Sequence, residues 1–288
     1  METWFILALA AMIGYGVQHF LFKVAAENGY NSIRVNTVFM LTVAAISGIV
    51  YLLSDAGVSG PYFLLFVLAN AITYLLANIC KIESYRFSPA TVAAPISKMY
   101  VALTPLLAYF IFRERITITQ LIGLTLATFA VVTLTHAHRH ETKKFRGIGL
   151  GLVFAAAAAA STSFNNLIGK SAAASGDIMS FIFFSYLASF ALALGLQKLV
   201  NREERPIREL ARNPGAIRLG IIIGIVNFIS YYLLLTALTQ GKAMVIFPLI
   251  GIGIAVTLGL AIWIYGEKLN REKAIGIGSC IAAAVLLA

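Results

Sequence analysis

Long apolar stretches separated by short polar connections fill the chain from one end to the other. Each stretch is about 20 residues long, which is the length at which a helix satisfies its own backbone hydrogen bonds across ~30 Å of hydrocarbon. The pattern predicts an all-α integral membrane protein with ten transmembrane helices, over residues 3–22, 32–53, 61–82, 89–112, 118–136, 147–169, 178–200, 214–239, 243–265 and 269–288. So little chain remains between these segments that no soluble domain is expected.

The composition agrees with a membrane protein, and no bound metal or other cofactor is expected. Hydrophobic residues make up 60% of the chain and charged residues 12%. The first stretch starts with Glu2 and lacks a basic leader, so we expect a retained helix rather than a signal peptide. Cys80 and Cys280 lie in separate predicted spans, where reduced packing residues are expected. The loop before the predicted span 147–169 holds alternating histidines, which leave a metal site as a less favoured alternative: His136, His138 and His140.

The basic residues are distributed unequally between the two sides of the predicted membrane bundle. The net charge is +10, yet no soluble aromatic platform accompanies the basic loops, so nucleic acid is not an expected partner. Seventeen Lys and Arg residues, with Lys81 among them, lie in loops on the side away from the termini, and four lie on the terminal side. The positive-inside rule therefore predicts that both termini face outward from a prokaryotic inner or plasma membrane.

The second half of the chain repeats the first at a nearly constant offset. An offset of 153 residues pairs Pro95 with Pro248 and Glu114 with Glu267, and an offset of 147 pairs Lys23 with Lys170. The pattern predicts two five-helix repeats, residues 1–136 and 147–288, joined by a linker over 137–146. Because five is odd, the second copy enters the membrane from the opposite side, as in many secondary transporters.

Two matching segments carry a resemblance to a known family. They are PISKMYVALTPLLAYFIFRERITITQLIGLTLATFAVV in the first half and FPLIGIGIAVTLGLAIWIYGEKLNREKAIGIGSCIAAAVLL in the second. Each resembles an EamA-type repeat, in which a helix, a short (G)ER/EK turn and a glycine-bearing helix follow one another. The turn is Arg113-Glu114-Arg115 in the first copy, which lacks the usual glycine, and Gly266-Glu267-Lys268 in the second. The resemblance to the drug/metabolite transporter superfamily implies a ten-helix carrier of small metabolites.

Lys98 is the most informative polar residue, because it lies near the middle of a predicted span. At 1.5 Å per residue from Ser88 it falls roughly 14 Å deep, where a lysine costs about 2.5–3.5 kcal/mol. We expect it to attract a carboxylate or phosphate of a substrate inside a wet cavity. A structural ion pair with Glu83 is the alternative. The position equivalent to Lys98 in the second half is Gly251, so only one such amine is present.

Asparagine and tyrosine residues recur on two predicted helices at helical spacing. Tyr74 and Asn78 share one helix face, and Asn227 and Tyr231 occupy the equivalent positions of the second half in exchanged order. These four residues are candidates for the wall of a substrate cavity. Hydrogen bonds that simply hold neighbouring helices together are an equally good interpretation.

A few other residues have candidate roles in coupling or in helix bending. His19 is a candidate proton-coupling group, although a lone histidine is more often a packing residue. Pro95 and Pro248 interrupt their helices at one register, which predicts bends that shape or gate the cavity. Glu114 and Glu267 lie at span ends among basic residues, where a solvated interfacial cluster is the default interpretation.

The sequence therefore favours a secondary carrier of a small metabolite, such as an amino acid or organic anion, that works by alternating access. It contains no nucleotide-binding loop, so a gradient would drive transport. A lipid flippase or scramblase is the alternative, and an intramembrane enzyme is less favoured because catalytic motifs are absent. Expected partners are the small-molecule substrate and membrane lipid, and a homodimer stays open as an assembly.

Overall fold

The structure is a computed structural model that describes residues 2–28, 30, 32–54, 62–87, 96–136, 148–175, 177–201, 214–265 and 271–287. The described residues are almost entirely helical and contain no β-strand, so the predicted all-α class is confirmed. In chain order their helices are α1 (Thr3–Glu27), α2 (Ser32–Leu53), α3 (Phe63–Phe87), α5 (Tyr100–Phe112), α6 (Ile118–His136), α7 (Ile148–Ser175), α8 (Ile178–Asn201), α10 (Pro214–Gln240), α11 (Ala243–Gly251), α12 (Ile254–Tyr265) and α13 (Arg271–Leu287). Each predicted segment contains one of these helices, except for 243–265, which contains two.

The length and the surface of these helices fit a bilayer. In the described chain seven helical segments are long and apolar enough to cross a membrane, with α11 and α12 counted together as Ala243–Ile264. Two shorter apolar stretches, Ile96–Phe112 and Ile118–Leu134, lie among them. Large apolar side chains point outward, and Leu52 and Trp263 are each 81% exposed. Such a surface suits contact with lipid rather than with water.

Local hydrogen bonds explain where two of the helices begin. At the start of α6 the Gln120 N–H donates to Thr117 Oγ1 at 3.2 Å, and the Thr117 N–H donates back to Gln120 Oε1 at 3.3 Å. At the start of α8 the Asp177 carboxylate accepts the N–H groups of Met179 and Ser180 at 3.0 and 3.2 Å. These caps satisfy donors that have no partner within the helix, so the helices can start directly after very short connections.

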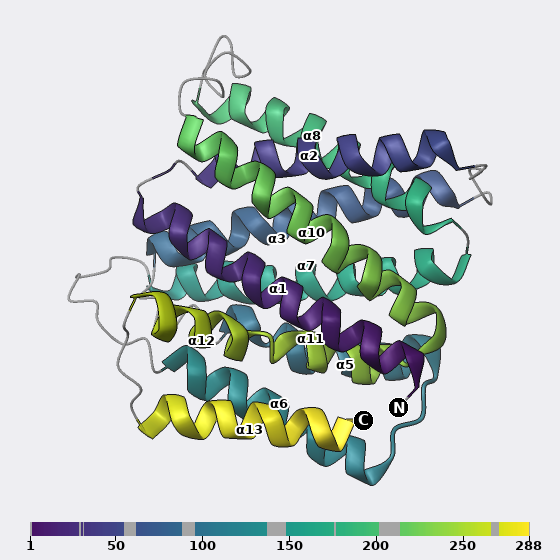
Figure 1. Ribbon diagram of the computed structural model, residues 1–288, viewed down its shortest axis with the longest axis vertical. Coiled ribbons are helices and arrows are strands. Elements are labelled where there is room, and N and C mark those ends of the chain that lie inside the picture. The colour runs from purple at the N-terminus through teal and green to yellow at the C-terminus, as the bar shows by residue number, and fades with distance from the viewer. Residues whose placement is uncertain are drawn as a thin grey trace.

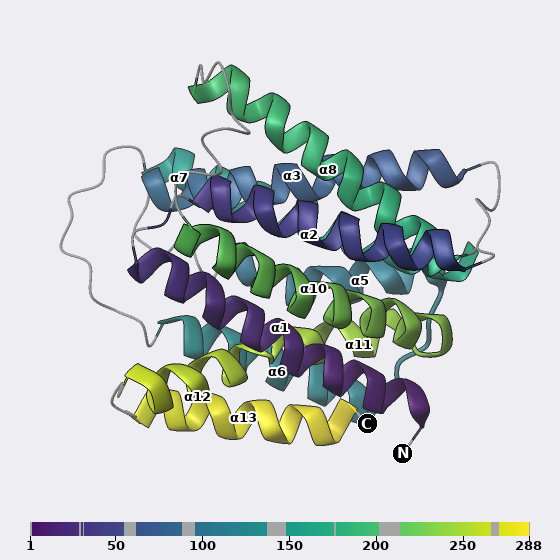
Figure 2. The ribbon, with the colours of Figure 1, turned by 45° about the horizontal axis from the view of Figure 1, so that its top comes forward.

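The helices of the first half interleave with those of the second. α6 packs along α13, α2 along α8, and α5 against α11. α3 packs along α7 and α1 along α10, while α5 also contacts α7 and α1 also contacts α12. Figures 1 and 2 show the α6–α13 pair at one end of the molecule and the α2–α8 pair at the other, with both chain ends on the same side. The fold is therefore held together mainly by contacts between the two halves.

Two of the predicted membrane-spanning segments are broken near their middle. Residues 96–98 are helical, Met99 forms a turn, and α5 begins at Tyr100. In the second half the break lies at residues 252–253, between α11 and α12. The Ala102 N–H donates to the Met99 carbonyl at 3.0 Å, and the Ala255 N–H donates to the Ile252 carbonyl at 3.0 Å. Both bonds span three residues instead of four. The helical backbone is therefore tightened at equivalent positions of the two halves.

The two breaks lie in the tightly packed middle of the fold. A Cβ at Gly251 would lie 2.5 Å from Cγ2 of Val101, so the broken segments of the two halves touch one another. A Cβ at Gly253 would lie 2.7 Å from the backbone oxygen of Met12 on α1. Gly259 differs, because a Cβ there would meet nothing within 4 Å. The helices therefore pack closely at the two glycines of the break and leave open space at Gly259.

Alanine substitutions at Gly253 and Gly259 should have opposite effects on stability. We expect Gly253→Ala to lower the free energy of unfolding by about 1–3 kcal/mol, because the Met12 backbone cannot move away easily. Gly259→Ala should be neutral or stabilising by up to ~1 kcal/mol, since alanine favours the helix. Thermal unfolding of the two purified variants in the same detergent measures both effects. Equal melting temperatures would contradict the close contact at the break.

Candidate functional site

Three basic side chains meet inside the bundle, next to the break in the first half. His19 lies on α1, Lys81 on α3 and Lys98 immediately before Met99. Both lysines lie close enough to His19 to act on it as like charges, and Lys98 lies close enough to Lys81 to do the same. All three are half-buried. We call them the basic cluster. The ion pair seen among the described residues is Lys170–Glu114, which involves none of the three. The cluster can therefore attract an anion.

Five tyrosines lie beside the basic cluster, one from each of five helices. We call them the tyrosine cluster: Tyr15 on α1, Tyr74 on α3, Tyr100 on α5, Tyr186 on α8 and Tyr231 on α10. The ring centroids of Tyr74 and Tyr186 are 6.1 Å apart, and those of Tyr186 and Tyr231 are 5.9 Å apart. Tyr15 lies close to Tyr74, Tyr100 and Tyr231. The tyrosines offer apolar ring faces together with hydroxyl groups that can donate hydrogen bonds.

Tyr100 connects the two clusters. The Lys98 ammonium lies over the Tyr100 ring, 5.7 Å from its centroid, at a distance that suits a cation–π contact. Tyr15 also lies one helical turn before His19 on α1, so both face the same side of that helix. The basic and aromatic groups thus form one continuous polar region in the middle of the bundle.

Amide side chains cross-link the helices around this region. The Tyr186 hydroxyl donates to Asn227 Oδ1 at 2.6 Å, and Asn227 Nδ2 donates to Gln18 Oε1 at 3.0 Å. On the other side of the fold, Asn165 Nδ2 donates to Asn70 Oδ1 at 2.9 Å. Gln18 and Asn165 are equivalent at the 147-residue offset, and each ties its helix to a helix of the opposite half. These amides hold the helices in place and orient the Tyr186 hydroxyl.

The structure gathers most of the candidate residues in this region. Tyr74 and Tyr231 belong to the tyrosine cluster, and His19 and Lys98 belong to the basic cluster. Asn227 takes part in the amide network, whereas Asn78 Nδ2 donates to the Tyr74 carbonyl of its own helix at 2.9 Å. The remaining candidates are the two prolines. Pro248 is buried within α11, and Pro95 lies outside the described residues.

Lys81 is the main residue that sequence reasoning missed, because it was counted among the charges of a loop. It lies within α3, in the apolar segment Phe63–Lys81. Its spacing could have shown this, since Lys81 follows Asn78 by three residues and Asn78 follows Tyr74 by four. The polar face of α3 therefore extends further than expected. Tyr15, Tyr100 and Tyr186 were missed because single tyrosines in apolar spans give no distinctive pattern.

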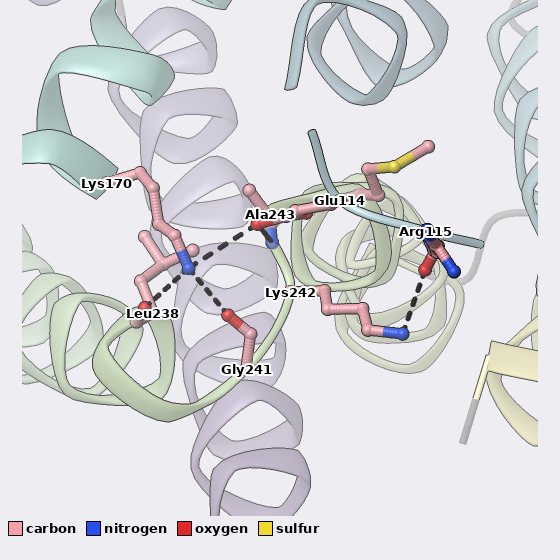
Figure 3. A network of polar contacts seen from close by, with 8 residues as sticks. Glu114, Arg115, Lys170, Leu238, Gly241, Lys242 and Ala243 are labelled. Carbon is pink, nitrogen blue, oxygen red and sulfur yellow. Dashed lines mark hydrogen bonds and ion pairs between the residues drawn. The ribbon is translucent and has the colours of Figure 1, made fainter. Parts of the chain in front are cut away.

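A second network of charges ties the α5–α6 turn to helices of the second half (Figure 3). Glu114 accepts the N–H groups of Ala243 and Met244 at 3.0 and 2.9 Å, at the start of α11. Lys170 of α7 lies 3.6 Å from Glu114 and donates to the carbonyls of Leu238 and Gly241, each at 2.8 Å. We call this network the Glu114 latch. It lies on the side of the molecule that holds both chain ends (Figure 1).

The latch corrects the interpretation of Glu114 as a solvated interfacial charge. The Glu114 side chain is only 11% exposed and that of Lys170 only 16% exposed. The carboxylate caps the start of α11, and the ammonium caps the carbonyl end of α10, so both charges are used structurally. The equivalent Glu267 lies outside the described residues.

Arg113, directly before Glu114, occupies the position where the first turn lacks the usual glycine. Arg113 has φ 52° and ψ 34°, in the left-handed region that a glycine adopts without strain. An arginine there costs roughly 1–2 kcal/mol. The second half has Gly266 at the equivalent position of the sequence.

Comparisons with known proteins identify what this chain resembles. The model of the EamA-like transporter family matches twice, over residues 2–135 and 149–288. An uncharacterized protein of Methanocaldococcus jannaschii is 23% identical over 141 residues, which cover 98% of that protein and 47% of this chain. One solved crystal structure superposes with a TM-score of 0.78 at 15% sequence identity, covering 96% of this chain and 95% of the other. At that identity the superposition establishes a shared fold alone.

Proposed function

Because the chain belongs to the EamA-like transporter family, we propose that it is a secondary carrier that moves a small metabolite across the membrane by alternating access. The observation that carries this proposal is the basic cluster beside the tyrosine cluster, at the point where the broken segments of the two halves touch. Discontinuous helices near the midplane are typical of substrate sites in such carriers. As a family member, the chain is an integral, multi-pass membrane protein.

The carrier is proposed to consist of two inverted five-helix repeats, residues 1–136 and 147–288. Several observations support this arrangement. The family model matches each half separately, and the relative from Methanocaldococcus jannaschii corresponds to about half of this chain. The repeat offsets match α1 with α7, α3 with α10 and α5 with α12. Under this correspondence the α3–α7 contact matches the α10–α1 contact, and the α5–α7 contact matches the α12–α1 contact. The three-residue bonds at Met99 and Ile252 also lie 153 residues apart.

The site residues have separate roles in this proposal. Lys98 orients an anionic group of the substrate, and Tyr74, Asn78, Asn227 and Tyr231 line the wall. Pro95 and Pro248 shape the helices that move, while His19 couples transport to protons. The half-burial of Lys98 and its position at the helix break support the first role, because an amine there needs a counter-charge.

Uptake into proteoliposomes tests the proposal. The purified protein would be reconstituted and given radiolabelled amino acids, monocarboxylates, dicarboxylates and phosphorylated metabolites, with and without a pH gradient. Accumulation of one class above empty liposomes supports a carrier, and a response to the gradient that is lost in His19→Gln supports proton coupling. Movement of labelled lipid without uptake of any solute would instead indicate a scramblase.

Both termini are proposed to lie outside the cell, as the charge distribution indicates. Single cysteines placed at the exposed residue 2, or added after residue 288, should react with a membrane-impermeant maleimide in intact cells. The native Cys80 and Cys280 are buried, so they should contribute little background. Labelling that occurs only after permeabilisation would reverse the orientation.

A further inference from the structure

Lys81 extends a polar face of α3 that runs toward Lys98. Tyr74, Asn78 and Lys81 follow one another at spacings of four and three residues, so they share one side of the helix. Glu83 follows Lys81 by two residues and thus points to a different side of α3. Lys81 therefore belongs to the same surface as Tyr74 and not to the surface that carries the nearest acid.

Lys81 and Lys98 lie near enough to repel one another, and no acid in the described part of the chain is paired with either amine. Lys81 and Lys98 are both half-buried in apolar segments, and Lys98 acts on Lys81 as a like charge. No described carboxylate is paired with either amine, and the adjoining stretch 88–95 contains no acid in its sequence. Like charges repel strongly where water is scarce, and buried charges in proteins are normally paired. An arrangement of this kind is expected where an external anion supplies the missing negative charge.

We propose that Lys81 and Lys98 together form a two-cation site for a small organic dianion, either a dicarboxylate or a phosphate monoester. The inference rests on the proposed transport function and specifies its substrate class. Lys98 binds one negative charge beside the Tyr100 ring, and Lys81 binds the second from the face of α3. His19 completes the site from α1, and the tyrosine cluster contacts the body of the substrate. A singly charged compound leaves one of the two amines without a partner.

Pairs of ligands that differ by one charge test this assignment. Succinate and succinamate have nearly the same size but carry two charges and one, and methyl phosphate and dimethyl phosphate provide the same contrast for phosphates. Dissociation constants would be measured at pH 7.5 and constant ionic strength, from the ligand-induced shift in thermal unfolding of the purified protein. We expect at least one dianion to bind ~10-fold or more tightly than its singly charged partner, which corresponds to about 1.4 kcal/mol. The pair that shows the preference tells dicarboxylates from phosphates.

Substitution of Lys81 should remove this preference selectively. In Lys81→Met the dianion should bind ~10-fold more weakly, while the singly charged ligand changes by less than about threefold. Lys98→Met should weaken both ligands. Lys198→Met is the matched control, because Lys198 is exposed at the end of α8 and should leave both affinities unchanged. Equal losses for both ligands in Lys81→Met, or no loss, would overturn the two-cation site.

The ligand-free protein gives a second, independent readout. Because Lys81→Met removes a repulsive charge and keeps the side-chain length, the ligand-free variant should melt at a higher temperature than the parent. A purely structural lysine would behave in the opposite way, with a lower melting temperature and weaker binding of every ligand. That result would also overturn the proposal.

Failure of this inference can be told apart from failure of the transport function. If proteoliposomes take up a singly charged or zwitterionic compound and show no preference for dianions, the carrier stands and the two-cation site is wrong. If a dianion binds with the predicted dependence on Lys81 but no solute crosses the membrane, the site stands and the transport function is wrong. Absence of both binding and uptake across the whole panel contradicts both.

Discussion

Transport by Lys98→Met should fall at least ~10-fold below that of the parent protein, because the substituted carrier has lost the charge that binds the anionic group of its substrate. A hydrogen bond to a charged group contributes about 1.5–3 kcal/mol, which corresponds to a 10- to 100-fold change. Methionine keeps the approximate length and the apolar part of the lysine. The initial rate of uptake into proteoliposomes, with the preferred solute of the panel, measures the effect.

Two further variants show whether the charge of Lys98 itself is responsible. Lys98→Arg keeps the charge on a bulkier group and should retain part of the activity, whereas Lys198→Met should transport like the parent. The ligand-free Lys98→Met protein should melt no lower than the parent, since Lys98 has no ion pair with a described carboxylate to lose. A Lys98→Met carrier with unchanged uptake of every transported solute would remove Lys98 from the binding site.

Removal of Glu114 should destabilise the fold more than any other single change considered for this protein. Glu114→Ala leaves the N–H groups of Ala243 and Met244 without their acceptor and deprives Lys170 of its counter-charge. Breaking one partner of a buried charge pair typically costs about 3–5 kcal/mol. The free energy of unfolding in mixed detergent micelles, followed by circular dichroism during titration with sodium dodecyl sulfate, measures the loss.

A double variant and a distant acid serve as controls for the latch. The double variant Glu114→Gln/Lys170→Met removes both charges. It should therefore lose less stability than the single variant Glu114→Ala, which keeps Lys170 without its counter-charge. Glu272→Ala at the exposed first turn of α13 should have a much smaller effect. If Glu114→Ala and Glu272→Ala unfold at the same detergent concentration, the latch contributes little to stability.

The positions of the helices could be predicted well from the sequence, but their internal breaks could not. The ten predicted segments each contain a helix, because the hydrophobic stretches needed to cross a bilayer are long and local. The prolines indicated bends in two helices, yet the chain breaks four residues beyond Pro248, at Ile252 and Gly253. Gly253 packs against the Met12 backbone of α1, and Gly251, just before the break, packs against Val101 of α5. Local sequence carries no direct sign of such contacts.

The candidate site shows a similar division between local pattern and tertiary contact. Lys98, His19, Tyr74 and Tyr231 were recognisable because polar groups in apolar spans are costly and therefore conspicuous. Lys81 was assigned to a loop because it lies near the end of its span, where lysines are common. Its part in the basic cluster became visible only when α1, α3 and the turn before α5 were brought together. Glu114 likewise resembled a solvated charge until its partners on α10 and α11 were known.

The sequence by itself determined the class of the protein, its ten apolar segments, the internal offset of the two halves and the family resemblance. All of these depend on hydrophobicity and residue spacing along the chain, which the thickness of the bilayer and the period of the helix dictate directly. Only the tertiary structure decided which polar groups face one another. The bond between Asn227 and Gln18 joins residues 209 positions apart. Such pairings follow from how the two halves interleave, because many different pairings are compatible with the same set of apolar helices.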